Sequence, residues 1–308
     1  MENVGNPERS GTEMRSSVVY RVASAHSANA GYEALVQVHE SRPDHVPDRG
    51  VVDGHDWAPI PQAFRAGEAL PPPWEDLFGA LRVGTVDDLV VVGQLGQSLD
   101  GRIATPNGHS HYINGVQGRA HLHRLRALVD AVVVGVGTAV ADDPQLTVRL
   151  VHGPQPARIV LDPQGRLPET ARLLTRDGAR RIVVTTPQAA RRLCADIETV
   201  AIEAADGRIA PAAILRALAT CGMRRILIEG GADTVSRFLS AGCLDRLHVM
   251  VAPMILGGGR PGLNLKPIER VDEALRPQVR AYPLGEDVLF DCDLSAQRRP
   301  VGQANRST

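Results

Sequence analysis

The stretch Arg225–Arg237 reads RILIEGGADTVSR and decides the fold. A run of strand length is followed by two glycines, and the residues after them are typical of a helix. In such a unit the backbone N–H groups of the turn and the positive end of the helix dipole face the carboxyl end of the strand. The stretch therefore predicts a strand–turn–helix unit with a site for pyrophosphate, and Glu229 at the strand tip can accept hydrogen bonds from a ring N–H or an amine.

The same alternation of strand and helix continues on both sides of this unit. Further strands are expected at Leu89–Leu95, Ala131–Val136, Arg158–Leu161, Arg181–Thr185, Arg246–Val251 and Val288–Asp293. Helical spacing is found at Val116–Val129, Pro187–Cys194, Ala210–Cys221 and Ala232–Ala241. Strands that are apolar throughout, separated by helices, indicate an α/β fold with a mostly parallel central sheet and helices on both faces. Such sheets bind ligands at the carboxyl ends of their strands.

Two further loops follow predicted strands. The first, GQSLDGRIA at Gly96–Ala104, continues through Gly108–Ile113; its glycines allow close approach to a ligand, although a turn-rich loop explains it equally well. The second, Gly135–Arg149, reads GVGTAVADDPQLTVR. Its Gly-x-Gly is a weak dinucleotide signal because the full Gly-x-Gly-x-x-Gly is absent, and its paired aspartates before Pro144 are also compatible with a simple turn.

Composition excludes several classes of function. The formal net charge is −1 and aromatic residues make up 3%, which disfavours a nucleic-acid partner and an anionic membrane surface. The four cysteines are far apart and form no Cys-x-x-Cys pair, so we expect neither a zinc site nor a disulfide framework. No apolar run reaches membrane-spanning length and no secretion signal is recognisable, so we expect a cytoplasmic protein.

The chain is expected to divide into four parts. Residues 1–50 are rich in Ser, Gly, Asn and Pro and predict a disordered arm. Residues 51–86 hold both tryptophans and predict a short docking extension, with Trp74, Leu77, Phe78 and Leu81 on one helical face. Residues 87–294 form the main domain, and the polar residues 295–308 predict a flexible tail.

Several motifs together resemble one family. They are QSLDGRIA at Gln97–Ala104, LRA at Leu125–Ala127, VGVGT at Val134–Thr138, ADDPQLTVR at Ala141–Arg149, IEGG at Ile228–Gly231 and APMILGG at Ala252–Gly258. This set is similar to the riboflavin-biosynthesis reductase domain, which has a dihydrofolate-reductase-like fold. Bacteria carry it as the C-terminal half of a bifunctional deaminase/reductase, and archaea and fungi carry it as a separate chain. The resemblance covers roughly two thirds of the sequence, and its Thr-x-x-Ala-Asp-Asp-Pro-x-Leu-Thr stretch is highly specific.

The resemblance implies an NADPH-dependent reductase. Its reaction would convert the ribosylamino group of 5-amino-6-(5-phosphoribosylamino)uracil to a ribitylamino group. The residues that would contact substrate are Ser110, Arg126, Leu146, Arg149 and Glu229. Those that would contact NADPH are Gly96, Tyr112, Thr138, Asp142, Gly231, Ala232, Asp233, Thr234, Val235, Ser236 and Arg237. Physical chemistry agrees, since guanidinium groups bind phosphate in a bidentate and permanently charged way; a solvated surface arginine is the alternative for Arg126.

The cofactor delivers the hydride in this family, so the protein chiefly aligns the reactants. Asp142 is the candidate proton donor by position, and solvent is the other. The sequence holds no His-x-Glu followed by Pro-Cys-x-x-Cys, so deaminase activity is not expected. It also departs from the bacterial pattern: Gln94 stands for a lysine, Tyr112 for a tryptophan, and Asn114-Gly115 for Thr-Ser.

Two alternative functions remain open. The chain could reduce another pyrimidine or a dihydrofolate-like pterin, or it could be a catalytically silent relative that binds a partner. A homodimer is expected from the resemblance. Four histidines, His109, His111, His121 and His123, do not have the spacing of a metal site, so no metal is expected; we expect them to be solvated or to order a loop.

Overall fold

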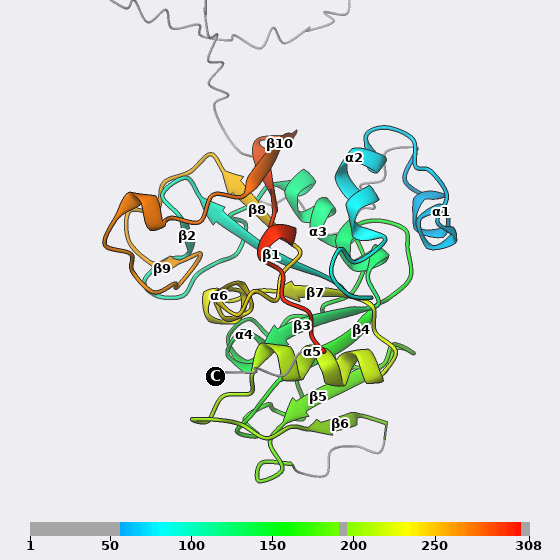
Figure 1. Cartoon of the computed structure of the whole chain (residues 1–308), viewed down its shortest axis with the longest axis vertical. Helices are drawn as coiled ribbons and strands as arrows, with labels where there is room; N and C mark the ends of the chain where they lie inside the picture. The colour runs from blue at the N-terminus through cyan, green and yellow to red at the C-terminus, as the bar shows by residue number, and fades with distance from the viewer. Residues whose placement is uncertain (1–55, 191–195, 303–308) are drawn as a thin grey trace, which may run out of the picture. The chain divides into compact units, whose positions relative to one another are not determined.

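The computed structural model describes residues 56–190 and 196–302. A nine-stranded sheet crosses it in the order β10-β11-β8-β1-β7-β3-β4-β5-β6 (Figure 1). The strands are β1 (Val90–Ser98), β3 (Ala131–Gly135), β4 (Ala157–Leu161), β5 (Arg181–Thr185), β6 (Glu198–Ala201), β7 (Arg225–Glu229), β8 (Arg246–Ala252), β10 (Gln278–Leu284) and β11 (Asp287–Asp293).

All neighbouring strands from β8 to β6 are parallel, and β11 and β10 add an antiparallel edge. β3, β4 and β5 are buried along nearly their whole length, which is why they read as continuous apolar runs. The predicted α/β fold with a mostly parallel sheet is therefore confirmed. Because parallel strands share a direction, the loops after β1, β3, β4 and β7 meet at one edge of the sheet.

Helices cover both faces of the sheet. The helices are α1 (Ile60–Ala66), α2 (Trp74–Phe78), α3 (Val116–Leu128), α4 (Val136–Asp142), α5 (Pro211–Thr220) and α6 (Ala232–Ser240). Residues of α1, α2 and α3 share one buried cluster with Val90 and Val92 of β1. Residues of α5 and α6 share a second cluster with Val91 of the same strand. Because successive side chains of a strand point to opposite faces, the two clusters lie on opposite sides of the sheet. No helix among the described residues is long and apolar enough to span a membrane.

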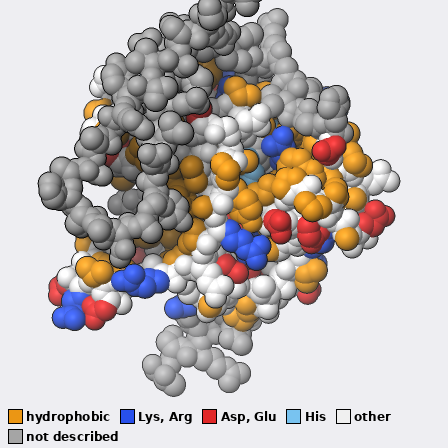
Figure 2. All heavy atoms as spheres, turned by 90° about the horizontal axis from the view of Figure 1, so that it is seen from above, with side chains coloured by type: hydrophobic (Ala, Val, Ile, Leu, Met, Phe, Trp, Pro, Cys, Tyr) orange, Lys and Arg blue, Asp and Glu red, His pale blue; other side chains and the backbone are white. Residues whose placement is uncertain are grey.

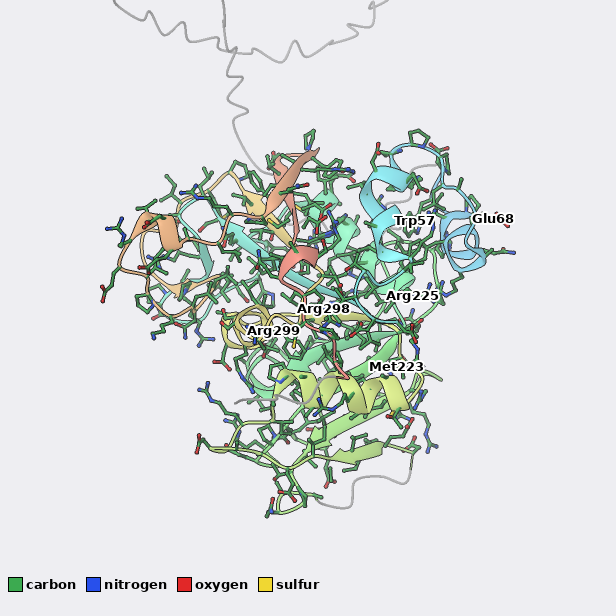
Figure 3. All side chains as sticks on the ribbon, viewed as in Figure 1. Trp57, Glu68, Met223, Arg225, Arg298 and Arg299 are labelled. Carbon is green, nitrogen blue, oxygen red and sulfur yellow. The ribbon has the colours of Figure 1, made fainter. Side chains whose placement is uncertain are left out.

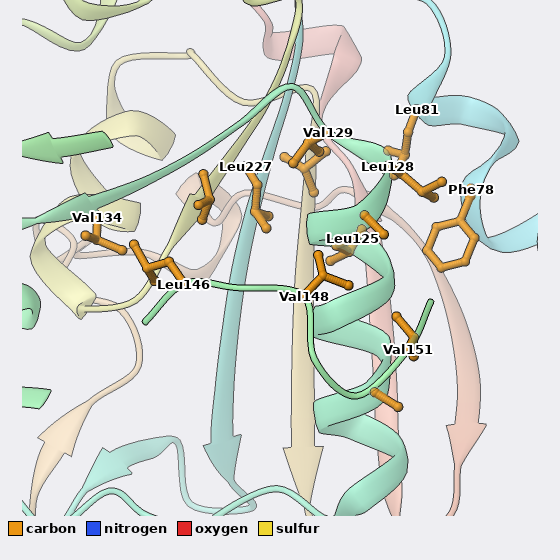
Figure 4. Packing of buried hydrophobic residues seen from close by; sticks show 14 of the residues in the cluster. Phe78, Leu81, Leu125, Leu128, Val129, Val134, Leu146, Val148, Val151 and Leu227 are labelled. Atoms are coloured by element: carbon orange, nitrogen blue, oxygen red, sulfur yellow. The ribbon is translucent and has the colours of Figure 1, made fainter. Parts of the chain in front are cut away.

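The N-terminal extension joins the main core. Trp57, Phe64 and Phe78 are fully buried, and the Trp57 indole donates to the carbonyl of His152 over 2.7 Å. Phe78 packs in the same cluster as Leu125 of α3 (Figure 4). The predicted apolar face from Trp74 to Leu81 is buried as expected, but the helix stops at Phe78 and a 3₁₀ turn follows. On the side of α1 and α2, hydrophobic and charged side chains remain interspersed at the surface (Figure 2).

A second, two-stranded sheet pairs β2 (Arg102–Ala104) with β9 (Arg260–Pro261). It links the loop after β1 to the loop after β8. Asp100 joins the same loops, because its carboxylate accepts the Ser98 hydroxyl over 2.6 Å and the backbone N–H groups of Leu256 and Gly257 over 3.1 and 2.7 Å. These hydrogen bonds lower the pKa of Asp100 to about 2.

The structure corrects several expectations. Residues 136–142 form helix α4, where the sequence predicts a loop, because no glycine or proline interrupts Thr138–Asp142. Residues 187–189 form a turn and residue 190 is irregular, where the sequence predicts a helix at Pro187–Cys194; residues 191–194 of that helix lie outside the described residues. Strands β6 and β10 were not expected, since they are largely exposed and lack an apolar run.

The expected flexible tail is wrong for residues 295–302. Arg298 is buried and pairs with Asp245 and Asp87 over 3.1 and 3.2 Å. Val301 is buried and donates its backbone N–H to Asp87 over 2.9 Å. Arg298 and Arg299 lie together near the end of α6 (Figure 3). Polarity misleads here because the buried Arg298 guanidinium and the Val301 N–H have carboxylate partners. Residues 303–308 and the predicted arm at 1–50 lie outside the described residues.

Candidate active site

An open cleft of about 1040 Å³ lies at the carboxyl ends of β1, β7, β3 and β4. Its walls come from the three loops that the sequence singles out, together with α3, the loop after β4, residues 207–208 and β9. This is where a doubly covered parallel sheet exposes backbone groups that no helix covers.

The turn between β7 and α6 forms one wall. Gly230 has φ +85°, a conformation that side-chain-bearing residues rarely adopt. A Cβ on Gly230 would lie 3.0 Å from Cγ2 of Thr138, and one on Gly231 would lie 2.8 Å from Oγ1 of the same residue. The backbone N–H of Gly231 donates to that hydroxyl over 3.1 Å. Thr138 of α4 therefore packs directly on the glycine turn and holds its shape.

The ends of β3 and β1 are also closely packed. A Cβ on Gly135, at the end of β3, would lie 2.5 Å from Oγ1 of Thr234 in α6. A Cβ on Gly96, at the end of β1, would lie 1.8 Å from Oδ1 of Asn114. A side chain at either glycine would therefore have to displace the side chain of Thr234 or Asn114. The second contact also shows what Asn114 does at one of the positions that depart from the bacterial pattern: its side chain packs on β1.

The opposite wall is charged. Arg126 of α3 forms a bidentate pair with Glu229, its Nε lying 3.0 Å from one carboxylate oxygen and its Nη2 bonding the other. Its Nη1 also donates to the carbonyl of Thr147 over 2.9 Å. Both side chains of the pair are less than 10% exposed. The pair fixes the Glu229 carboxylate at the cleft floor, because a bidentate guanidinium contact allows one orientation.

Glu229 begins a row of buried polar residues that crosses the sheet. In strand register it lies beside Gln94 of β1, which lies beside His248 of β8, which lies beside Asp291 of β11. All four are at most 6% exposed. His248 Nε2 lies 3.2 Å from the Asp291 carboxylate, and its Nδ1 lies 3.1 Å from Nε2 of His121 in α3. The row links the cleft floor, formed by Glu229 and Gln94, to the antiparallel edge of the sheet.

Three arginines surround His123 of α3. Burial, followed by the positive charges of Arg126, Arg149 and Arg119, lowers its pKa to about 2. Its Nδ1 accepts the backbone N–H of Arg149 over 3.0 Å. Arg119 lines the cleft and lies over the ring of Tyr112, with 5.4 Å from its central carbon to the ring centroid. Positive charge is therefore concentrated at this end of the cleft, where a phosphate group would bind favourably.

Asp142 ends α4 at the rim of the cleft. Desolvation raises its pKa above the ordinary value for an aspartate, although the charges of His111 and Arg260 oppose the shift. A carboxyl group with a raised pKa keeps its proton to a higher pH than an ordinary aspartate, which makes Asp142 a better proton donor.

The structure brings most of the predicted residues to the cleft wall. They are Ser110 and Glu229 of the predicted substrate contacts, and Gly96, Tyr112, Thr138, Asp142, Gly231, Ala232, Asp233, Thr234 and Arg237 of the predicted cofactor contacts. Five predicted residues lie outside the lining: Arg126, Leu146, Arg149, Val235 and Ser236. Val235 and Ser236 are buried on the inner face of α6, because a helix cannot turn seven consecutive residues toward one ligand. Leu146 is buried in the core beneath the loop.

Polar lining residues that the sequence did not assign to a ligand include Asn114, Arg119, Arg208 and Arg260. Arg119 lies seven residues before Arg126, which is two helical turns, so the spacing could have placed both on one face. Arg208 and Arg260 follow no predicted strand, and only tertiary structure brings them to the cleft. His121 and His123 are buried rather than solvated or in a loop. No group of three or more His, Cys, Asp or Glu side chains in the described segments could hold a metal ion.

The cleft fits a dinucleotide. Cβ atoms at Gly230, Gly231 and Gly135 would crowd Thr138 and Thr234, so these glycines let α4 and α6 pack closely around the start of α6. The donors available there are backbone N–H groups at the positive end of a nine-residue helix. The cleft volume also lies at the upper end of the range for small-molecule and cofactor sites.

Most of the described residues match a known protein family. The model of the family described as the RibD C-terminal domain matches residues 90–290. The 2,5-diamino-6-ribosylamino-4(3H)-pyrimidinone 5′-phosphate reductase of Methanothermobacter thermautotrophicus is 34% identical over 209 residues, covering 65% of this chain and 96% of the relative. The riboflavin biosynthesis protein RibD of Aquifex aeolicus is 35% identical over 196 residues, covering 63% of this chain and 54% of that protein. The chain thus spans about half of the RibD protein and nearly all of the archaeal reductase.

Solved structures agree. A structure of RibD from Acinetobacter baumannii superposes with a TM-score of 0.59 at 30% identity, covering 67% of this chain and 57% of that one. The riboflavin biosynthesis reductase Rib7 of Saccharomyces cerevisiae superposes with a TM-score of 0.57 over 71% of this chain and 98% of that one. At 18% identity the yeast protein supports the fold alone.

Proposed function

Since the chain belongs to the RibD C-terminal domain family, we propose that it is a reductase that uses NADPH to convert the ribosylamino group of a phosphoribosylaminopyrimidine to a ribitylamino group. The observation that carries the proposal is one cleft with two unlike walls. One is a glycine turn at a helix start, and the other is a charged wall with Arg119 and Glu229, whose carboxylate is held by Arg126 from outside the lining. A dinucleotide needs the first and a phosphorylated sugar on a polar ring needs the second.

The residues that would hold the cofactor pyrophosphate are Gly231 and Ala232, with Thr138 supporting the turn. The substrate would lie between Glu229, Gln94 and the Tyr112–Arg119 pair. Glu229 then accepts hydrogen bonds from the pyrimidine. Arg119 in the cleft lining and the exposed Arg149, which lies outside the lining beside the same His123, attract the phosphate.

NADPH, when bound, supplies a hydride. The carbon that accepts it belongs to a ring-opened imine, and the nitrogen must gain a proton so that the product is a neutral amine. Asp142 is the candidate donor, because desolvation raises its pKa, and solvent is the other source. The remaining side chains align the reacting atoms and exclude water.

The direct test is the loss of NADPH absorbance when the purified chain is given substrate. The names of the relatives supply two candidates, which differ in the group at position 2 of the pyrimidine: the 2,5-diamino pyrimidinone phosphate and 5-amino-6-(5-phosphoribosylamino)uracil. Turnover of either compound supports the proposal. Binding of NADPH without turnover of either would direct attention to another pyrimidine or a pterin, and to Gln94 and Tyr112 as the positions that select it.

A substitution can distinguish substrate binding from cofactor binding. Arg149→Ala should weaken affinity for the phosphorylated substrate about tenfold or more, the size of a lost charge-assisted contact, while leaving NADPH affinity unchanged. Steady-state kinetics with each ligand varied in turn measures both. Equal losses for the two ligands would contradict the assignment of Arg149 to the substrate.

We also propose a homodimer, as the family resemblance implies. The edge strand β10 and the adjacent β11 expose Val279 and Phe290, which a second copy could cover. Light scattering after size-exclusion chromatography would test it, and a mass of one chain at micromolar concentration would contradict it.

A further inference from the structure

The loop that carries Arg149 has no regular structure of its own. Residues 143–156 join the end of α4, at the cleft rim, to the start of β4 at the opposite edge of the sheet, and they form neither helix nor strand. Side-chain contacts must therefore fix the course of this loop. Its residues Val148 and Val151 are buried beside α3, whereas Arg149 between them is exposed (Figure 4).

Helix α3 holds one part of the loop. Nδ1 of His123 accepts the backbone N–H of Arg149 over 3.0 Å. The Arg126 guanidinium donates to the carbonyl of Thr147 over 2.9 Å. The backbone on either side of the Arg149 side chain is thus tied to the helix that also lines the cleft with Arg119.

The N-terminal extension, residues 56–82, holds the next part of the loop. The fully buried Trp57 donates its indole N–H to the carbonyl of His152 over 2.7 Å. Trp57 is itself fixed by α3 and α2, because the Arg124 guanidinium lies 5.5 Å from its ring and the Trp74 ring lies 5.2 Å from it, edge to face. This one hydrogen bond therefore joins a rigid aromatic group to an irregular loop.

Helix α1 of the extension reaches the same place. Its Arg65 donates to the carbonyl of Ala127, in the last turn of α3, over 2.9 Å. A Cβ on Gly153 would lie 2.5 Å from the Cβ of Ala127 and 3.6 Å from the Cγ of Pro61 in α1. The loop backbone therefore passes closely between α1 and α3 at this point.

The direction of the Arg149 side chain depends on the course of this loop, because Arg149 lies outside the cleft lining. Its charge acts on His123 together with that of Arg119, which does line the cleft. A charged side chain on a loop that can shift spends part of its binding energy on ordering the loop. We propose that Trp57 is a positioning residue for the substrate: it holds the loop against α3 and so aims Arg149 at the substrate phosphate; this rests on the proposed function.

The test is binding of ribose 5-phosphate to the full chain by calorimetry, which requires no turnover. This probe is the phosphorylated sugar of the proposed substrate. Trp57→Phe removes the indole donor and keeps an aromatic ring in the cluster. It should weaken binding of ribose 5-phosphate about fivefold, the effect of one lost hydrogen bond, and leave NADPH affinity unchanged. In turnover of a pyrimidine, KM should rise by the same factor with kcat unchanged.

A double variant separates positioning from a general loosening of the protein. Arg149→Ala alone should weaken binding of ribose 5-phosphate. Adding Trp57→Phe should then weaken it no further, because the residue that Trp57 positions is already absent. Losses that multiply in the double variant, or an equal loss of NADPH affinity in Trp57→Phe, would overturn the inference.

Trp74→Phe is the matched control. Trp74 belongs to the same aromatic group, with the Arg124 guanidinium 4.9 Å from its ring, but its indole nitrogen has no hydrogen-bond partner within residues 56–190 and 196–302. This variant loses a comparable ring without losing a contact to the loop, so it should bind ribose 5-phosphate as the wild type does. An equal loss in Trp74→Phe, or an unchanged affinity in Trp57→Phe, would contradict the proposal.

Hydrogen exchange reports on the loop directly. In Trp57→Phe the amides of residues 147–153 should exchange faster, while those of residues 225–234 at the glycine turn keep the wild-type rate. Arg65→Met is a second variant at an exposed position, which removes one contact of α1 and no core volume. It should raise exchange in the same loop by a smaller factor. Unchanged exchange in both variants would mean that the extension does not hold the loop.

These outcomes are separate from those of the proposed function. A chain that binds ribose 5-phosphate through Trp57 and Arg149, but reduces neither pyrimidine, supports the inference and contradicts the proposed substrate. A chain that reduces a pyrimidine with a KM that Trp57→Phe does not change supports the reductase assignment and overturns the inference. A chain that neither binds ribose 5-phosphate nor reduces a pyrimidine overturns both.

Discussion

On the face of the sheet covered by α5 and α6, the core is an apolar cluster built around residues such as Ile228, Val235 and Phe238. On the face covered by α3, a similar apolar cluster is crossed by the row of Glu229, Gln94, His248 and Asp291. The two faces meet at the cleft, where they contribute differently. The α6 face offers backbone groups at a glycine turn, and the α3 face offers charged side chains.

The difference shows how one sheet serves two ligands. Backbone N–H groups at a helix start bind any pyrophosphate and need only glycines and close packing. A substrate ring must be distinguished by placed donors and acceptors, and these must be buried and held to keep one orientation. The α3 face therefore carries buried polar groups, which are tolerated because they are paired.

The largest expected effect comes from breaking the Arg126–Glu229 pair. Arg126→Met keeps much of the side-chain volume but leaves the Glu229 carboxylate buried without its partner. The free energy of unfolding should fall by about 3–5 kcal/mol, as for other buried pairs that lose one member. Urea denaturation monitored by circular dichroism measures it.

The control uses the same chemistry at the surface. Arg180 and Glu198 also form a two-armed pair, with bonds of 2.8 Å, but their side chains are 45% and 46% exposed. Arg180→Met should cost no more than about 1 kcal/mol. If the two variants lose similar amounts of unfolding free energy, burial does not make the Arg126–Glu229 pair more important for stability than a surface pair.

The histidines of the α3 face predict a pH dependence of stability. Burial lowers the folded-state pKa of His123 to about 2 and that of His121 well below its usual range. Unfolded histidine has a pKa of about 6.5. Below that pH the unfolded chain binds protons that the folded chain does not. The contribution of these histidines to the free energy of unfolding is therefore fully present above pH 6.5 and is lost as the pH drops below it. Each histidine should account for about 2 kcal/mol between pH 7 and pH 5.

His123→Asn isolates one of these contributions. The asparagine oxygen can accept the N–H of Arg149 in place of Nδ1, but it does not titrate in this range. Urea denaturation at pH 5, 6, 7 and 8 should show a shallower loss of stability than in the wild type, by about 2 kcal/mol at pH 5. Parallel profiles for the two proteins would mean that His123 is accessible to protons in the folded state.

The apolar strands and the glycine turn of the cleft could be predicted from sequence, because their sequence signals are local. β5 and β7 have the predicted bounds, and the Gly230–Gly231 turn lies where the strand–turn–helix pattern places it. Apolar runs, glycines and helix starts depend on neighbours in the chain, so one sequence suffices to recognise them.

The polar row and the partners of the arginines could not be predicted in this way. Glu229 lies 103 positions from Arg126, and His248 lies 127 from His121. Arg126 was expected to contact substrate directly, but its guanidinium faces Glu229 and Thr147. Strand order decides such pairings, and β1 lies between β7 and β8 only because the chain crosses over twice. Edge strands such as β10 are exposed and leave no apolar run to find.

The smallest expected effect on stability tests the backbone wall of the α6 face. Gly230 and Gly222 follow and precede the same strand β7, with φ of +85° and +86°. An alanine at either position should cost about 1–2 kcal/mol of stability, because the left-handed conformation crowds the Cβ atom. Only at Gly230 does the new Cβ also meet Thr138, at 3.0 Å, whereas nothing lies within 4 Å at Gly222.

Gly230→Ala should therefore weaken NADPH binding as well, by about tenfold, which corresponds to ~1.4 kcal/mol. The displaced Thr138 hydroxyl no longer fixes the N–H of Gly231, so the donors of the helix start lose their alignment. Gly222→Ala should show the same loss of stability with unchanged NADPH affinity, measured by calorimetry. If both variants bind NADPH equally well, the shape of the turn does not determine binding, and side chains would carry recognition on the α6 face as they do on the α3 face.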